Sequence, residues 1–202
     1  MNHAQLADNS TWVTLEIPAS SAELFEFLKN TERLFRLNPY LDIQHWEEKE
    51  GGQIHLQALN EMNGVKYDLD IVLESSQPGT SFLLRYSQGL KKALEISLQA
   101  APAPGRSILT LREHYHQVWQ GEQQLKEIDH SLIPWGNAIR LYLKAIKAWA
   151  WFWPYRWYKE KLWVRMRPTH RRITRMLVWV TLLEFIVFFF VFIIYWLELA
   201  RN

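Results

Sequence analysis

Apolar and polar residues alternate with a period of two over much of the first 116 residues. Val13, Leu15 and Ile17 alternate with polar neighbours, and the same alternation returns in later segments separated by glycine-containing turns. Asn63-Gly64 is a strong signal for a β-hairpin turn. This pattern predicts strands joined by short connections, which pair as an antiparallel sheet with one apolar face.

Two helical regions are expected beside this sheet. Ser20 and Glu23 form a capping box that opens a short helix after Pro18, and a second helical turn is expected at residues 31–37. Farther along, apolar residues recur at steps of three and four and predict one face of a long helix: Trp135, Ile139, Tyr142, Ile146, Trp149 and Trp153. The apolar faces of the sheet and of this helix have to bury each other. The expected order is one strand, two short helices, six strands and a long closing helix.

Residues 176–197 form the longest apolar run of the chain. Glu184 is the only charged residue among them, and they include neither glycine nor proline. A helix of these 22 residues is about 33 Å long, enough to cross a hydrocarbon layer of roughly 30 Å. The run therefore predicts one C-terminal transmembrane helix, followed by a short tail at residues 198–202. Glu184 either marks a contact with a partner protein or is a protonated or snorkelling carboxyl without a role.

The formal net charge of +2 conceals a steep gradient along the chain. Residues 1–155 carry 14 Lys and Arg against 18 Asp and Glu, whereas residues 156–175 carry eight basic residues and one acid, Glu160. Tryptophans are interleaved with these cations, so residues 154–175 are expected to form a collar in the lipid headgroup layer. The residues expected at the membrane interface are Trp157, Trp163, Arg165, Arg167, Arg171, Arg172 and Arg175.

Basic residues that precede an apolar span stay on the cytoplasmic side of a membrane. The N-terminal region is therefore expected in the cytoplasm, as a tail-anchored domain of the bacterial inner membrane or an equivalent one. Residues 1–10 show no basic start followed by an apolar stretch, so they are expected to be a flexible N-terminus and not a signal peptide. Basic stretches with aromatic residues also bind single-stranded nucleic acid, but the adjoining span favours membrane lipid as the partner.

The candidate chemistry of the chain is sparse. It has no cysteine, which excludes disulfides, thiol catalysis and cysteine–zinc sites. His114 and His116 share the polar face of a predicted strand and are expected in solvent, so neither a metal site nor a cofactor is predicted. Glu113 has the inward parity of Tyr115, and an inward carboxyl is a candidate acid or base. The favoured alternative is a carboxylate at the open end of the domain interior, either hydrated or paired with a cation such as Arg85.

The segment VTLEIPASSAELFEFL at residues 13–28 resembles the first strand and first helix of the SRPBCC superfamily, the START-like or helix-grip proteins. Leu111–Glu113 is similar to the end of the last strand in that superfamily, and residues 11–153 are assigned to such a domain. The resemblance implies an α+β helix-grip fold, in which a curved antiparallel sheet of seven strands is closed by a long C-terminal helix. It also implies a deep cavity for hydrophobic ligands such as lipids, sterols, polyketides or quinones.

The cavity of such a fold lies between the sheet and the long helix. Candidates for its lining are Tyr67, Ile71, Phe82, Tyr86, Ile96, Leu111, Trp135, Ile139 and Tyr142. Apolar periodicity reports burial and not a void, so each of these residues is equally consistent with a packed core.

The combination of a cavity-forming fold and a membrane anchor predicts a binding or transfer protein. It would take an apolar ligand, such as a lipid, an isoprenoid or a quinone-like molecule, from the bilayer and present it to a partner. Two alternatives remain, because a fold does not fix a function. One is an adaptor with a filled core that recruits a cytoplasmic enzyme to the membrane. The other is a cyclase-like or aromatase-like enzyme with Glu113, Tyr67 or Tyr115 as acid–base groups.

Overall fold

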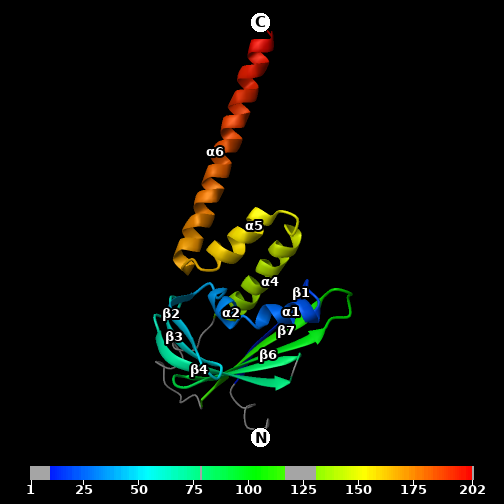
Figure 1. Cartoon of the computed structure of the whole chain (residues 1–202). Helices are drawn as coiled ribbons and strands as arrows, with labels where there is room; N and C mark the ends of the chain where they lie inside the picture. The colour runs from blue at the N-terminus through cyan, green and yellow to red at the C-terminus, as the bar shows by residue number, and fades with distance from the viewer. Residues whose placement is uncertain (1–9, 78, 117–130, 202) are drawn as a thin grey trace. The chain divides into compact units, whose positions relative to one another are not determined.

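The computed structural model describes residues 10–77, 79–116 and 131–201 (Figure 1). The chain forms two compact units, Met1–Arg165 and Met166–Asn202. The strands of the first unit are β1 (Ser10–Ile17), β2 (Leu41–Lys49), β3 (Gln53–Asn60), β4 (Lys66–Gln77), β5 (Ser81–Tyr86), β6 (Lys91–Ala100) and β7 (Ser107–Tyr115). Its helices are α1 (Ser21–Leu28), α2 (Thr31–Arg36), α4 (Leu132–Ala148), α5 (Trp153–Trp157) and the π-helix η2 (Tyr158–Trp163). The second unit contains α6 (Pro168–Arg201).

The seven strands form one antiparallel sheet in the order β1-β7-β6-β5-β4-β3-β2. The chain starts at one edge, reaches the far edge through α1 and α2, and returns strand by strand until β7 pairs with β1. The helices α1, α2 and α4 lie together on one side of this sheet (Figure 1). This arrangement confirms the predicted α+β fold, with a seven-stranded antiparallel sheet and a long helix after it.

The start of α1 and the turn before β4 follow from local sequence. The Ser20 hydroxyl accepts a hydrogen bond from the Glu23 backbone N–H (3.3 Å), and the Glu23 carboxylate accepts one from the Ser20 N–H (2.9 Å), which completes the predicted capping box. The hydrogen bond from the Ser20 backbone holds the pKa of Glu23 below its usual value. Gly64 has a φ of 74° in the turn between β3 and β4, a conformation that other residues rarely adopt.

The core of the first unit lies between the apolar face of the sheet and its helices. Ile71 of β4 and Ile139 of α4 are fully buried in it. Phe35 of α2 packs between two indoles, with its ring centroid 5.5 Å from that of Trp46 and 5.4 Å from that of Trp135. The apolar sheet face predicted from strand alternation and the apolar stripe of α4 therefore pack against each other, as expected.

The long helix α4 ends before Trp149, so the prediction that Trp149 and Trp153 extend its apolar face is wrong. Proline disfavours the helical conformation at the residue before it and is not accommodated in a helix interior. A turn therefore separates α4 from α5, and Pro154 lies in the first turn of α5. The rings of Trp149, Trp151 and Phe152 contact one another at this turn. Trp151 and Trp153 are 76% and 75% exposed.

The predicted apolar helix is present as α6, which begins at Pro168 and not at Met176. Proline is favoured in the first turn of a helix, because its missing N–H would have no partner there. The most apolar window of α6 has a mean hydropathy of 2.8. By length and composition α6 is a candidate membrane span.

Gly136 allows α4 to approach β1 closely. A Cβ atom at this position would collide with Leu15 Cδ1 and lie 3.3 Å from Val13 Cγ1. We expect Gly136→Val to lower the free energy of unfolding by about 1–3 kcal/mol, because the added methyl groups force α4 away from the sheet. Urea titration of the full chain in a non-ionic detergent, followed by near-UV circular dichroism, measures this loss.

Lys144→Val is the matched control, since Lys144 lies on the exposed face of α4. Its free energy of unfolding should fall only because valine has a lower helix propensity, a loss of about 0.5 kcal/mol. Equal losses in the two variants would contradict close packing at Gly136.

Candidate functional site

Two adjoining cavities lie between the start of β4 and the turn that joins β5 to β6. The outer cavity, the mouth, has a volume of about 360 Å³ and is lined by residues 65–69 and 88–91. The inner cavity, the throat, has a volume of about 40 Å³ and reaches Phe35, Leu56 and Trp135. The two cavities share most of their lining from β4 and from the turn, so they adjoin each other and are treated together as one candidate site.

The wall of the throat is mostly apolar, and the side-chain polar groups of Trp135 and Asn38 in it have hydrogen-bond partners. Trp135 Nε1 donates a hydrogen bond to the backbone oxygen of Leu34 (2.8 Å). Asn38 Nδ2 donates to Ser131 Oγ (2.9 Å), and Asn38 Oδ1 accepts from the backbone N–H of Tyr40 (3.0 Å). A volume of about 40 Å³ holds a few water molecules, whereas small-molecule pockets have roughly 300–1,000 Å³. Of these two cavities, the mouth has the volume of a ligand site and the throat does not.

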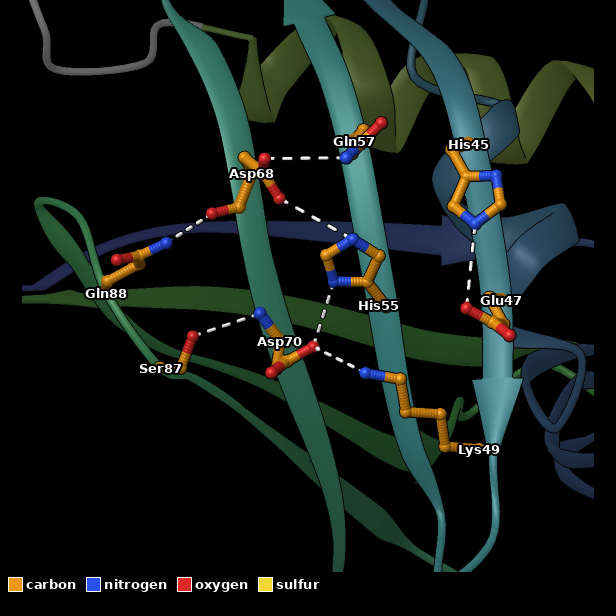
Figure 2. A network of polar contacts seen from close by, with 9 residues as sticks. All are labelled: His45, Glu47, Lys49, His55, Gln57, Asp68, Asp70, Ser87 and Gln88. Carbon is orange, nitrogen blue, oxygen red and sulfur yellow. Dashed lines mark hydrogen bonds and ion pairs between the residues drawn. The ribbon is translucent and has the colours of Figure 1, made fainter.

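Hydrogen bonds hold the turn after β5 against β4 (Figure 2). The Asp70 N–H donates to Ser87 Oγ (2.9 Å), the Ser87 N–H donates to Asp70 O (2.8 Å), and the Gln88 side-chain amide donates to Asp68 O. His55 Nδ1 lies 3.0 Å from Asp70 Oδ1, and its Nε2 lies 3.5 Å from Asp68 Oδ1. The hydrogen bond from His55 holds the pKa of Asp70 below its usual value. This network on the outer face of the sheet joins the turn to β3 and β4.

Lys91, which lines both cavities, belongs to a buried polar group with Glu113 and Tyr115. Lys91 Nζ lies 2.6 Å from Glu113 Oε1, and the Tyr115 hydroxyl donates to Glu113 Oε2 (2.6 Å). Glu113 is 1% exposed. Burial, together with the charge of Glu113, raises the pKa of Tyr115 above its usual value. Both oxygens of Glu113 have partners, so its carboxylate is held as a buried ion pair.

Glu113 is buried with its apolar neighbours on β7, as its parity predicts, but its cation is Lys91 and not Arg85. Arg85 alternates with Tyr86 along β5 and lies on the outer face, where its Nε donates to Glu74 (2.9 Å). Glu113 lines neither the mouth nor the throat. Its carboxylate therefore has no contact with the space that a substrate would occupy at this site.

The prediction that His114 lies in solvent is wrong. It is 3% exposed, and its Nε2 lies 3.2 Å from Glu95 Oε2. Strand parity assigns a face of the sheet, but β7 is an interior strand, so exposure also depends on the side chains of β1 and β6. His116 is exposed, as expected. Within the described part of the chain, no three His, Asp or Glu residues gather as a metal site.

Three of the nine predicted lining residues lie at this site: Tyr67, Tyr86 and Trp135. The other six line neither cavity and belong to the packed core: Ile71, Phe82, Ile96, Leu111, Ile139 and Tyr142. The sequence pattern did not reveal residues 88–90 or Lys91, because the turn has no periodicity and Lys91 is the first residue of β6. The one available signal was Leu90, an apolar residue inside a glycine-containing turn.

The residues expected at the membrane interface divide between the two units. Trp157 of α5 is exposed, whereas Trp163 stacks on Tyr142 with ring centroids 6.3 Å apart. Lys159 Nζ lies 4.0 Å from the Trp163 ring centroid. Arg165 ends the first unit. The remaining residues belong to the second unit, immediately before α6 or in its first two turns: Arg167, Arg171, Arg172 and Arg175.

No family model matches this chain, and no curated protein is similar to it in sequence. Solved structures do resemble it. A START superfamily protein from Mycobacterium smegmatis has a TM-score of 0.55 at 13% identity, covering 69% of this chain and 99% of its own. The protein XoxI from Bacillus cereus has a TM-score of 0.54 at 15% identity, covering 69% and 99%. A conserved protein from Geobacillus kaustophilus has a TM-score of 0.52 at 14% identity, covering 69% and 97%.

Removing Lys91 would leave the carboxylate of Glu113 buried without a cation. We expect Lys91→Met to lower the free energy of unfolding by about 3–5 kcal/mol, since an uncompensated buried charge is costly. The double variant Lys91→Met/Glu113→Leu removes both charges and should recover most of that loss. Arg85→Met is the control, because it breaks an exposed ion pair worth about 1 kcal/mol or less. Additive losses in the double variant, measured by urea titration, would contradict the buried ion pair.

Burial raises the pKa of Tyr142 to about 12, against the lowering effect of the nearby Arg33, and among the described residues no hydrogen bond of normal geometry reaches its hydroxyl. A tyrosine in the unfolded chain ionises near pH 10. The unfolded state therefore loses this proton first, and stability falls between about pH 10 and pH 12. We expect Tyr142→Phe to be at least as stable as the wild type at pH 7 and to lose less stability in that alkaline range. Identical pH profiles of the free energy of unfolding would contradict a neutral, buried hydroxyl.

Proposed function

Because this chain has the START-like, helix-grip fold and a candidate membrane span, we propose that it is a membrane-anchored binding protein for an apolar molecule. The ligand is a lipid, an isoprenoid or a quinone-like compound, taken from the bilayer and presented to a partner protein. The observation that carries this proposal is the adjoining mouth and throat, whose walls combine the rings of Tyr67, Tyr86 and Trp135 with the turn residue Leu90.

Binding requires the throat to widen, since its volume is about 40 Å³. The turn at residues 87–90 is the part of the wall that moves at least cost. Its hydrogen bonds to Asp68 and Asp70 lie on the solvent side of the sheet, where water replaces them. Displacement of this turn merges the throat with the mouth, and each CH₂ group buried there contributes about 0.8 kcal/mol to binding. The process is extraction of the ligand and not a reaction.

The anchor in this proposal is α6, supported by exposed aromatic residues of the first unit. Trp151, Trp153 and Trp157 are exposed, and indole rings are favoured at the membrane interface. Basic residues precede the apolar part of α6, so the positive-inside rule assigns the first unit to the cytoplasm, at the bacterial inner membrane or an equivalent one. Glu184 within α6 is then a candidate contact for the helix of a partner protein.

A second function is favoured by one observation, the packing of most predicted lining residues as core. Ile71, Leu111 and Ile139 are fully buried, and the throat is small. A domain with a filled core and an anchor would be an adaptor that recruits a cytoplasmic enzyme to the membrane. An enzymatic role of Glu113 has less support, because its carboxylate is paired with Lys91 and lines neither cavity.

The substitution Leu90→Glu distinguishes the binding protein from the adaptor. The substitution places a carboxylate on the wall shared by the mouth and the throat, so we expect at least about a tenfold loss of bound apolar ligand. Native mass spectrometry of the full chain in a mild detergent, combined with organic extraction, measures the ligand. Val72→Glu is the matched control, since Val72 is exposed on the outer face of β4.

An adduct of one molecule per chain in the wild type and in Val72→Glu, lost in Leu90→Glu, supports the binding protein. A clean apo mass of the wild type contradicts it and favours the adaptor. An adduct of equal amount in all three proteins identifies lipid held around α6, which also contradicts binding in the throat.

A further inference from the structure

A second, polar cavity of about 170 Å³ lies between α2 and η2, within the first unit. Its charged lining consists of Glu32, Arg33 and Arg36 from α2 and of Glu160, Lys161 and Arg165 from η2 and the residues after it. None of these residues lines the mouth or the throat. Four cations face two acids here, so the cavity attracts anions.

The acids of this cavity are already paired, whereas two of its cations are not. Glu32 Oε1 lies 2.7 Å from Arg36 Nε, and Glu160 Oε1 lies 3.7 Å from a guanidinium nitrogen of Arg156, outside the cavity. Both Lys161 and Arg165 are exposed. Across the described ranges of the chain, no hydrogen bond or ion pair joins either side chain to another residue. Their charges therefore remain available to a ligand.

Arg33 adds a third cation, which is held in place by its surroundings. Its Nη2 donates to the backbone oxygen of Phe27 (2.9 Å), and its guanidinium carbon lies 4.3 Å from the centroid of the Phe27 ring. Arg33 Nε is buried without a hydrogen-bond partner among the described residues. These contacts fix the position of the guanidinium without placing a carboxylate against it, so its charge adds to the attraction for an anion.

We propose that this cavity binds a phosphate group. Arginine presents a planar fork that matches two phosphate oxygens, and lysine adds a compact point charge. A phosphate monoester carries about −1.5 to −2 charges at pH 7, which balances the excess of four cations over two acids in the cavity. A carboxylate ligand would leave part of that excess uncompensated.

The chain path favours a lipid headgroup as the source of the phosphate. Arg165 precedes Pro168, the first residue of α6, by three residues. The lining of the cavity therefore ends close in sequence to the candidate membrane span. The inference that the phosphate belongs to a lipid rests on the proposed membrane anchoring. The inference that the cavity binds a phosphate group does not. Free phosphate is the other source of the same chemistry.

Isothermal titration calorimetry of the full chain, in a non-ionic detergent at near-physiological salt, tests this site. The probes are water-soluble dihexanoyl phosphatidic acid and inorganic phosphate, each with a protein-free micelle blank. We expect Lys161→Gln/Arg165→Gln to weaken the binding of phosphatidic acid about tenfold or more, because charge-assisted hydrogen bonds are lost. This double variant avoids Arg33, whose packing on Phe27 makes its loss a threat to the fold.

Two matched variants complete the experiment. Lys161→Arg/Arg165→Lys keeps both charges and one planar guanidinium fork, so it should lose less affinity than Lys161→Gln/Arg165→Gln. Arg140→Gln/Lys144→Gln removes two exposed cations from α4, outside the cavity, and should bind as the wild type does. Leu90→Glu removes no charge from this cavity and should not weaken phosphate binding, so failure of the apolar site and failure of the phosphate site are separate results.

At least about tenfold tighter binding of phosphatidic acid than of inorganic phosphate identifies a lipid headgroup as the ligand. Equal affinities for the two probes identify free phosphate. The absence of saturable binding for both probes would overturn the site. An equal loss of affinity in Arg140→Gln/Lys144→Gln would overturn it as well, because the effect would then follow net charge and not the cavity.

Discussion

The structure depends on the burial of one apolar sheet face beneath α1, α2 and α4. Alternation along the strands supplies that face, and α4 supplies the stripe that contains Trp135 and Ile139. Gly136 brings α4 close to β1, the strand at one edge of the sheet. Space remains toward β4 and the β5–β6 turn, where the mouth and throat lie. The place of the candidate site is therefore a consequence of where the closing helix is seated.

Local chemistry made much of this fold predictable. Strand alternation, the capping box at Ser20 and the apolar run of α6 each report an interaction between residues that are close in sequence. The end of α4 was harder, because aromatic residues continue at helical spacing past the turn, and Pro154 alone marks the break. The ion-pair partner of Glu113 could not be predicted from the sequence. A register shift after Lys91 in the β6–β7 pairing determines which cation lies beside it.

The candidate site was less predictable than the fold for a physical reason. Periodicity reports that a side chain is buried, but a cavity exists only where the packing of separate elements leaves space. Ile71 and Ile139 are as apolar as any lining residue and are fully packed. The mouth, by contrast, is made in part by the turn residues 88–90, whose sequence follows no repeating pattern. Voids of this kind are properties of the assembled fold.

One short helix, α2, connects the two cavities. Phe35 lines the throat and the next residue, Arg36, lines the polar cavity, so a change in the position of α2 alters both walls. A phosphate held at Arg33, the cation of α2 without a carboxylate partner among the described residues, would restrain α2 and raise the cost of moving Phe35 to widen the throat. Linkage then requires the reciprocal effect, so that an apolar ligand in the throat weakens phosphate binding by the same factor. An exchange of this kind suits a protein that releases one ligand at the surface where it meets the other.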